Sequence, residues 1–488
     1  MLDLRGDNLS EGSELHADVK ELLEREYLPR YLHQRRWFAS KRAAPPLLTI
    51  KEAISLEPAG GPVLLFIEER TQKPKTYFVP VGIIRNPPGP LTGPYICEVR
   101  LAAGNGYLVD ALEDTSLFVD LIAALEQAQE NGSLCKLGLK LTRASAYPTN
   151  VTAHDVRRLG AEQSNSSLQV GPALFKAFRK LEGGIHPELE MGRYLSGPGH
   201  FANTPRLLGS LEKLHPDPIT LCLFQQMIEN RGNAWEVVCQ LVRRGNPNDS
   251  AQLVELAALL GSRTANLHTA LASGVDEDFS AEPILPEDIS QWIDDVCRNA
   301  TISLDALAGH PSRVCQRLVA RREELYAAIR DLPPTKVHSL KSRLHGDFHL
   351  GQVLVTNEDV FIIDFEGEPM RTFSERRSKY PPMKDIAGLL RSFDYVVATI
   401  DRPEMQQLET GVAATIREAK RQFLETYRAQ ACGFPESILE ANALLRLFMF
   451  EKTFYEIRYE IDNRPEWVEI PVAGALALLD GQITLFEI

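Results

Sequence analysis

The chain has 488 residues, of which 44% are hydrophobic, and this is too long for one core, so two or three domains are expected. Its 53 basic and 66 acidic residues give a net charge of −13, which argues against nucleic acid as the main partner. No run of about 18 apolar residues occurs, so no membrane span is predicted. The seven cysteines form no CxxC pair or zinc-site spacing. Together with a polar, acidic N-terminus unlike a secretory signal, they predict reduced thiols and a cytoplasmic location.

The first domain is predicted over residues 1–150 as an N-terminal α/β domain. Residues 13–32 carry apolar side chains on one helical face. Residues 46–112 contain short runs of branched and aromatic residues broken by Pro and Gly, which is typical of a β-meander. A helix at about 115–130 and a strand at about 136–143 complete this domain.

Two further domains are predicted. Residues 151–232 form a small β-rich lobe, with strands expected at 156–159, 168–170, 173–178 and 219–228 and a helix from Pro187. Residues 233–488 form a larger, mainly helical lobe that includes a strand pair within 343–366. The expected fold class is therefore α+β with two lobes and an additional N-terminal domain.

Three polar residues in the larger lobe have the spacing of a phosphoryl-transfer site. Such chemistry needs a carboxylate to orient and deprotonate the acceptor hydroxyl, an amide about five residues later, and a second carboxylate after an apolar strand. Asp347, Gln352 and Asp364 match this pattern. We predict that Asp347 is the catalytic base and that Gln352 and Asp364 hold Mg²⁺. Glu366 is expected to reach a second metal or to support the loop, and a solvent-facing carboxylate is the alternative interpretation.

Two histidines lie beside the predicted base. His345 is expected to support the loop through hydrogen bonds rather than to react. His349 either contacts the acceptor or packs within the loop.

Lys176 lies in the middle of an apolar strand, where a charge needs an edge position or an anionic partner. The phosphates of ATP would supply an anion, although an ordinary exposed strand lysine would give the same pattern. The carboxylate partner of Lys176 in the following helix is expected to be Glu190 rather than Glu188.

Two further segments are predicted to bind ATP. Residues 160–167 form a polar loop that matches neither G-x-G-x-x-G nor Walker A, but its backbone N–H groups and hydroxyls suit phosphates. Its candidate ligands are Ser164, Asn165 and Ser166. The strand at 219–228 ends before a Gly-containing turn, as an adenine-binding hinge would, and its candidates are Gln225, Met227 and Ile228.

Six segments carry a family resemblance. They are Q-R-R-W-F-A-S-K (34–41), E-Q-S-N-S-S (162–167), H-G-D-F-H-L-G-Q (345–352), I-D-F-E-G-E-P (363–369), K-D-I-A-G-L-L-R-S-F-D-Y (384–395) and Y-E-I-R-Y-E-I-D-N-R-P-E-W (455–467). With these segments the chain resembles the maltokinases, relatives of the aminoglycoside phosphotransferases with a eukaryotic-kinase-like fold. The resemblance covers nearly the whole chain and implies that the N-terminal domain is a cap domain.

The resemblance also implies an activity. It implies ATP-dependent phosphorylation of maltose at the anomeric hydroxyl, with Mg²⁺, to give maltose 1-phosphate and ADP for α-glucan synthesis from trehalose. Gln352, unusual for kinases at large, fits this family. Because such kinases are often fused to or associated with trehalose synthase, this enzyme is a hypothetical partner.

The segment 455–467 contains groups that suit a sugar. Aromatic rings stack on sugar faces, whereas carboxylate, amide and guanidinium groups bind hydroxyls. The candidates are Tyr459, Glu460, Asn463 and Arg464, together with His349 and the neighbouring Trp467. Packing at a helix end, with surface ion pairs, is the alternative interpretation.

Two other functions stay open from the sequence. A kinase for another sugar, such as glucosamine, would share the catalytic loop. A non-catalytic partner of trehalose synthase would have no need of Asp347, Gln352, Asp364 and Lys176 together, so the sequence favours an enzyme.

Overall fold

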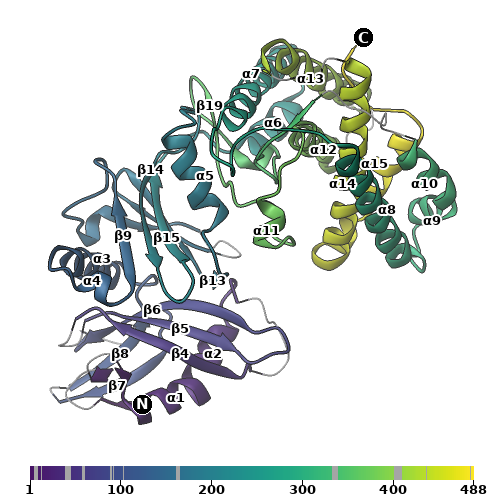
Figure 1. Ribbon diagram of the computed structural model, residues 1–488. Helices are drawn as coiled ribbons and strands as arrows, with labels where there is room; N and C mark the ends of the chain where they lie inside the picture. Colours follow the sequence, from purple (N-terminus) through teal and green to yellow (C-terminus); the bar gives the residue numbers. More distant parts are fainter. Residues whose placement is uncertain are drawn as a thin grey trace. The chain divides into compact units, whose positions relative to one another are not determined.

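The computed structural model of the chain describes residues 1–4, 9–11, 14–38, 45–57, 61–87, 91, 93–102, 104–160, 165–331, 339–400, 409–432, 434–435, 437–483 and 485–487. Within these ranges the chain forms two units. The first comprises Met1–Glu190 and Arg206–Met227, and the second comprises Met191–Pro205 and Ile228–Ile488. Figure 1 shows their helices and strands. The predicted boundary at residue 150 falls inside the first unit, so the division into three domains remains a prediction.

The first unit is built on two β-sheets (Figure 1). The first sheet has seven strands, in the order β1-β7-β8-β6-β5-β4 with β13 paired to β6. These strands are β1 (Leu2–Asp3), β4 (Leu48–Ser55), β5 (Val63–Glu69), β6 (Lys75–Arg85), β7 (Cys97–Leu101), β8 (Gly104–Asp110) and β13 (Lys180–Leu181). A separate pair consists of β2 (Ser10–Glu11) and β3 (Glu14–Leu15).

The second sheet has six strands in the order β10-β11-β12-β15-β14-β9. They are β9 (Leu139–Arg143), β10 (Val156–Arg158), β11 (Asn165–Val170), β12 (Ala173–Phe178), β14 (Leu207–Lys213) and β15 (Ile219–Gln226). The helical segments of this unit are α1 (Ala17–Leu22), the π-helix Leu23–Tyr27, α2 (Leu28–His33), α3 (Thr115–Glu130), α4 (Ser133–Lys136) and the short 3₁₀ turn Ala153–Asp155. Helix α5 (Pro187–Ser196) begins in this unit.

The seven-stranded sheet is buried on both faces, and the sequence of β5 shows why. Successive strand residues point to opposite faces. Val63 and Leu65 pack into a cluster with the N-terminal helices, whereas Leu64 and Phe66 pack into a cluster with α3 and the second sheet. A strand covered on both sides needs apolar residues at every position, which explains the unbroken run at 63–67.

Several predicted elements are confirmed. The helix expected at about 115–130 is α3, whose N-cap Asp114 accepts hydrogen bonds from the backbone N–H groups of Ser116 and Leu117. The strand expected at 173–178 is β12. The loop expected at 160–167 was predicted too long: Asn165 and Ser166 already belong to β11, because their backbone pairs with β12.

One buried ion pair joins the two sheets of the first unit. A guanidinium nitrogen of Arg179, just after β12, lies 2.8 Å from the Asp110 carboxylate at the end of β8, and neither side chain is exposed. The Tyr31 hydroxyl donates to the same carboxylate at 3.2 Å, and the Trp37 ring lies 4.8 Å from the guanidinium carbon. Tyr31, Asp110 and Arg179, which lie far apart in the sequence, therefore meet at one buried ion pair.

The second unit is mainly helical around one large hydrophobic cluster. Its helices are α6 (Ala234–Arg244), α7 (Pro247–Ala272), α8 (Pro286–Leu307), α9 (Arg313–Ala320), α10 (Arg322–Arg330), α11 (Phe373–Arg376), α12 (Met383–Ile400), α13 (Glu409–Gln430), α14 (Ile438–Asn463) and α15 (Glu469–Leu479). Two short 3₁₀ turns are Leu350–Gln352 and Pro465–Trp467, and two strand pairs are β16 (Glu282–Pro283) with β17 (Leu340–Lys341) and β18 (Val353–Val355) with β19 (Val360–Ile362).

Helix α12 approaches the loop before β18 unusually closely. A Cβ atom at Gly388 would lie 2.5 Å from the carbonyl oxygen of Phe348, so only glycine allows this approach. The contact brings one face of α12 against residues 345–352.

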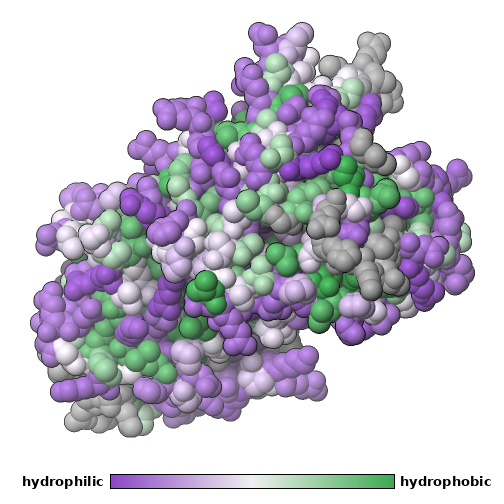
Figure 2. Space-filling model, turned by 45° about the horizontal axis from the view of Figure 1, so that its top comes forward, coloured by the Kyte–Doolittle hydropathy of each residue, from purple (hydrophilic) through white to green (hydrophobic). Residues whose placement is uncertain are grey.

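Figure 2 shows hydrophilic residues over much of the visible surface, with smaller hydrophobic patches between them. No helix in the described part of the chain is long and apolar enough to cross a membrane.

Replacing Arg179 with Met should destabilise the first unit. It would leave the Asp110 carboxylate buried without its cation, a change that typically costs about 3–5 kcal/mol. Urea denaturation followed by far-UV circular dichroism measures the loss. The exposed Arg157 on β10 supplies the control, since R157M should change stability by less than about 0.5 kcal/mol. Equal midpoints for R179M and R157M would contradict this role of the ion pair.

Candidate functional site

The loop that contains Asp347 is held in place by a buried carboxylate of α12. Asp385 accepts hydrogen bonds from the backbone N–H groups of His345 and Gly346, at 2.9 and 3.0 Å, and its Oδ2 atom also contacts His268 Nε2 at 3.2 Å. Burial alone would raise the pKa of Asp385, but the contacts with His268 and the backbone N–H of Gly346 hold it below its ordinary value. The carboxylate therefore stays ionised and fixes the backbone just before Asp347.

His345 links the two segments that carry the predicted active residues. Its Nδ1 atom accepts from the backbone N–H of Asp347 at 3.3 Å, so Nε2 carries the proton and donates to the carbonyl oxygen of Ile363 at 2.9 Å. The prediction that His345 supports the loop is confirmed.

Gln352 and Asp364 lie side by side. The amide nitrogen of Gln352 donates to Asp364 Oδ2 at 2.9 Å, and a backbone hydrogen bond from Ile363 N to Gln352 O closes the same turn. Asp364 has a φ of 67°, a left-handed conformation that is uncommon for residues other than glycine and recurs at functional sites.

The donor set around this turn fits Mg²⁺, which prefers oxygen ligands and retains water or phosphate oxygens in its shell. The Asp364 carboxylate and the amide oxygen of Gln352 would be its protein ligands. The Glu366 backbone carbonyl accepts from Arg376 at 3.3 Å, and the metal role of the Glu366 side chain remains a prediction. In the described ranges no group of three or more His, Cys, Asp or Glu residues could hold a metal by itself.

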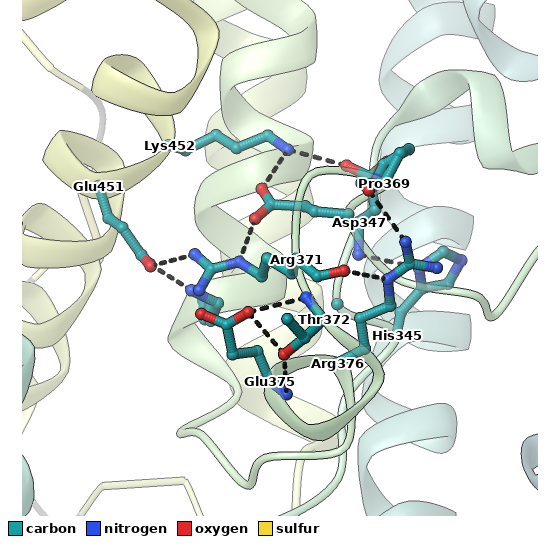
Figure 3. Close-up of polar contacts among 12 residues, drawn as sticks. His345, Asp347, Pro369, Arg371, Thr372, Glu375, Arg376, Glu451 and Lys452 are labelled. Carbon is teal, nitrogen blue, oxygen red and sulfur yellow. Dashed lines mark hydrogen bonds and ion pairs between the residues drawn. The ribbon is translucent and has the colours of Figure 1, made fainter. Parts of the chain in front are cut away.

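Asp347 has a cationic partner that the sequence did not predict. The Lys452 ammonium, from α14, lies 2.8 Å from Asp347 Oδ1 and 2.9 Å from Glu368 Oε1 (Figure 3). Burial opposes the charge of Lys452, but the two carboxylates raise its pKa well above the ordinary value. Lys452 is therefore a permanent cation beside the predicted base.

The charges continue away from Asp347 as an alternating chain. Arg371 lies 2.6 Å from Glu451 (Figure 3) and 2.6 Å from Glu368. Glu451 also pairs with Lys384. Burial opposes ionisation of Glu368, but Lys452 and then Arg371 lower its pKa to about 2. Opposite signs thus alternate from Asp347 to Lys384, and every buried charge is compensated.

A cavity of about 410 Å³ opens beside Asp347 within the second unit. Its aromatic lining comprises Trp235, Tyr395, Tyr455, Tyr459 and Trp467. Its ionisable lining comprises Asp347, His349, Lys452, Glu456, Glu460 and Arg464. This size and this mixture of rings and polar groups are typical of a site for a small polar molecule.

The three carboxylates of this lining each have a cationic partner. Asp347 pairs with Lys452, as described. Glu456 lies 2.8 Å from the Arg391 guanidinium, and Glu460 lies 2.7 Å from that of Arg464. Among the residues that the structure describes, no carboxylate of the cavity therefore lacks a counter-ion.

Most of the predicted sugar-binding residues meet at this cavity: His349, Tyr459, Glu460 and Arg464 all line it. Asn463 does not, because its exposed amide donates to the Tyr459 carbonyl along the helix. Burial lowers the pKa of His349, and its Nδ1 accepts from the Gly351 backbone N–H at 3.0 Å, so its ring faces the cavity uncharged.

In the first unit, Lys176 is buried on β12 and forms an ion pair with Glu188 at 2.8 Å. The prediction that Glu190 is its partner is wrong. Two positions along an α-helix turn a side chain by about 200°, so Glu188 and Glu190 project from different sides of α5. The Gln225 amide donates to the same Glu188 at 3.3 Å, which places one predicted hinge residue beside this pair.

The other nucleotide candidates are placed as follows. Asn165 and Ser166 line a separate cavity of about 210 Å³ together with Gln34–Trp37 of the N-terminal domain, and the Ser166 hydroxyl accepts from Arg179 Nε at 2.7 Å. Ser164 lies outside the described residues. The Met227 N–H donates to the Pro172 carbonyl and the Ile228 carbonyl accepts from Asn230. Their contact with a nucleotide remains a prediction.

Asp385, Glu368 and Lys452 were not among the predicted site residues. The first two lie within quoted motifs, where nothing in the spacing distinguished them. Lys452 had a visible signal: the charged pair Glu451-Lys452 interrupts the apolar run Leu447–Phe450, and charges in a buried helix face need partners.

Comparisons with known proteins agree with this architecture. Residues 31–114 match the family model described as the maltokinase N-terminal cap domain, and residues 155–415 match that of the phosphotransferase enzyme family. Because the second match spans more than half of the chain, the chain belongs to the phosphotransferase enzyme family. It carries a maltokinase-type cap domain at its N-terminal side, which confirms the resemblance seen in the sequence.

Two curated relatives are glucosamine kinases. That of Streptacidiphilus jiangxiensis is 27% identical over 338 residues, covering 67% of this chain and 74% of the relative. That of Mycolicibacterium smegmatis is 26% identical over 335 residues, covering 67% and 81%. The solved structure of a glucosamine kinase in complex with glucosamine, ADP and inorganic phosphate is 21% identical, with a TM-score of 0.66 over 94% of this chain and 99% of that one. This likeness confirms the kinase-like α+β fold.

The charge on Glu368 should appear in the pH dependence of stability. Its folded pKa of about 2 lies below the ordinary 4.5, so its contribution is present above pH 4.5 and is lost as the pH falls toward 2. The difference in urea midpoint between the wild type and E368Q should therefore be largest at about pH 6 and shrink as the pH falls from 4.5 toward 3.

The exposed turn residue Glu358 supplies the matched control, and E358Q should differ little from the wild type at every pH. A midpoint difference for E368Q that does not change with pH would contradict the depressed pKa.

Proposed function

We propose that the protein is a sugar kinase that transfers the γ-phosphoryl group of ATP to the anomeric hydroxyl of maltose, giving maltose 1-phosphate and ADP. The observation that carries this proposal is the position of Asp347 in the wall of the 410 Å³ cavity, which aromatic side chains also line. The cap-domain match supports maltose as the acceptor, since that domain is described from maltokinases.

The proposed reaction assigns a role to each group near the loop. Asp347 orients the acceptor hydroxyl and takes its proton as the hydroxyl oxygen bonds to the γ-phosphorus. The bond from the γ-phosphorus to the β,γ-bridging oxygen breaks, and ADP leaves. Gln352 and Asp364 would hold Mg²⁺, which when bound neutralises charge on the phosphates. Lys176, oriented by Glu188, would contact the nucleotide phosphates.

The geometry of α14 supports an acceptor larger than one sugar ring. From Lys452 to Tyr459 the helix advances about 10 Å along its axis. The Tyr455 and Tyr459 rings are stacked along this face, with centroids 6.4 Å apart, and the Arg464 guanidinium lies 4.6 Å from the Trp467 ring. This surface suits the apolar faces of linked pyranose rings, with polar groups at its edges for hydroxyls.

Glucosamine is the second candidate acceptor, and the names of the two curated relatives favour it. Its ammonium group would need a carboxylate partner. All three carboxylates of the cavity are already paired with Lys452, Arg391 and Arg464. A neutral sugar avoids this competition, so the charges of the cavity favour maltose. The links to trehalose synthase and to α-glucan synthesis rest on the sequence resemblance alone.

An acceptor panel tests the proposed substrate. The purified protein is given ATP and Mg²⁺ with maltose, glucose, glucosamine, trehalose or an aminoglycoside, and ADP release is followed. Maltose should give the highest kcat/KM. A higher kcat/KM for glucosamine would overturn maltose but keep the sugar-kinase assignment, and no turnover with any acceptor would overturn both.

Replacing Asp347 with Asn should lower kcat by about 100-fold or more, because general-base catalysis contributes on the order of 10²–10⁴. ATP binding, measured by calorimetry, should persist, since the change removes no predicted nucleotide contact. The exposed Asp462 on α14 gives a control variant, D462N, that should keep normal kcat. Near-normal turnover of D347N would reject Asp347 as the base.

A further inference from the structure

We propose that Lys452 is a positioning residue for phosphoryl transfer: together with Glu368 it fixes the carboxylate of Asp347 in the orientation that the acceptor hydroxyl requires. The inference rests on the proposed function, because it assumes that Asp347 acts on that hydroxyl. It adds a residue from the sugar-binding helix that no catalytic-loop motif contains.

The first support is the asymmetry of the Asp347 contacts. Asp347 Oδ1 accepts a hydrogen bond from the Lys452 ammonium at 2.8 Å, whereas no hydrogen bond from within the described ranges reaches Oδ2. Asp347 follows Gly346, whose φ of 86° is left-handed, so the loop turns sharply just before the Asp347 side chain. With one oxygen held by Lys452, the other is left for the acceptor.

The second support is that Lys452 is itself held. Its ammonium contacts Glu368 at 2.9 Å and lies 4.7 Å from the centroid of the Tyr455 ring. Glu368 in turn is fixed by Arg371, and Arg371 by Glu451. A long lysine side chain loses its usual rotamer freedom in such surroundings, so the Lys452 ammonium can hold Asp347 Oδ1 in one position.

The third support is energetic. Burying ion pairs costs desolvation free energy that their attraction only repays, and apolar residues of the same volume often give equal or greater stability. Six alternating charges between Asp347 and Lys384 are therefore a poor way to stabilise a core. Orientation of a reacting group is what such a network can provide and an apolar core cannot.

Helix α14 connects this network to the acceptor cavity. Tyr455 and Glu456 lie one turn after Lys452 on the same helix and line the cavity, as does Tyr459 one turn further. The helix that binds the acceptor thus also holds the base, and the distance between them is set by one rigid element.

A double-mutant cycle tests the inference. K452M should lower kcat by about 100-fold, the scale expected from a misplaced reacting group, while the KM for ATP changes by less than about 3-fold. In the D347N background the same substitution should lower the residual kcat by less than about 3-fold, because Lys452 acts through Asp347. The acceptor is whichever sugar in the panel is turned over.

Two further variants keep the test decisive. K452R retains the charge of the network, so it should fold if K452M does not, but its planar guanidinium should misplace Asp347 and lower kcat. K420M removes a lysine that is buried even more deeply than Lys452 but is paired with Asp394 rather than with Asp347, and it should keep normal kcat.

Normal kcat in both K452M and K452R, with D347N inactive, would overturn this inference and leave the proposed function intact. Effects of K452M and D347N that multiply would also overturn it, because Lys452 would then act independently of Asp347. Near-normal turnover of D347N would reject Asp347 as the base and would overturn this inference with it, whereas the sugar-kinase assignment is tested separately by the acceptor panel.

Discussion

A charge buried in a protein interior must be compensated, and this constraint organises the second unit around Asp347. Asp385 is compensated by two backbone N–H groups and His268, and it thereby fixes the loop backbone. Lys452 is compensated by Asp347 and Glu368, and it thereby fixes a side chain. In both cases the buried charge requires hydrogen-bond or ion-pair partners to offset its desolvation cost, and these contacts fix the positions of the groups involved.

The same constraint bears on the acceptor. The cavity beside Asp347 is lined by aromatic rings and by carboxylates that already have cationic partners. Its lining therefore presents ion pairs rather than uncompensated charges. Neutral hydroxyl groups can exchange hydrogen bonds with such a surface without breaking an ion pair. Close packing at Gly388 holds α12 against the loop, and the stacked Tyr455 and Tyr459 rings of α14 line the cavity.

The sequence predicted what is encoded locally. The spacing of Asp347, Gln352 and Asp364 follows from one strand pair, and the structure places Gln352 against Asp364 as that spacing requires. The sequence did not predict contacts between distant segments, such as the one between Lys452 and Asp347, which lie 105 residues apart along the chain. The choice of Glu188 over Glu190 also depends on the rotation of α5 against β12, which sequence spacing does not fix.

The most direct test of the account is the structure of the phosphorylated product. Maltose, ATP and Mg²⁺ are incubated with the protein, and the product is examined by ³¹P and ¹H nuclear magnetic resonance. Phosphorylation at the anomeric hydroxyl should give a single phosphate ester, alkali-stable and acid-labile, whose phosphorus couples to the anomeric proton. A phosphate on any other carbon of maltose, or no phosphorylated maltose while another sugar is consumed, would contradict it.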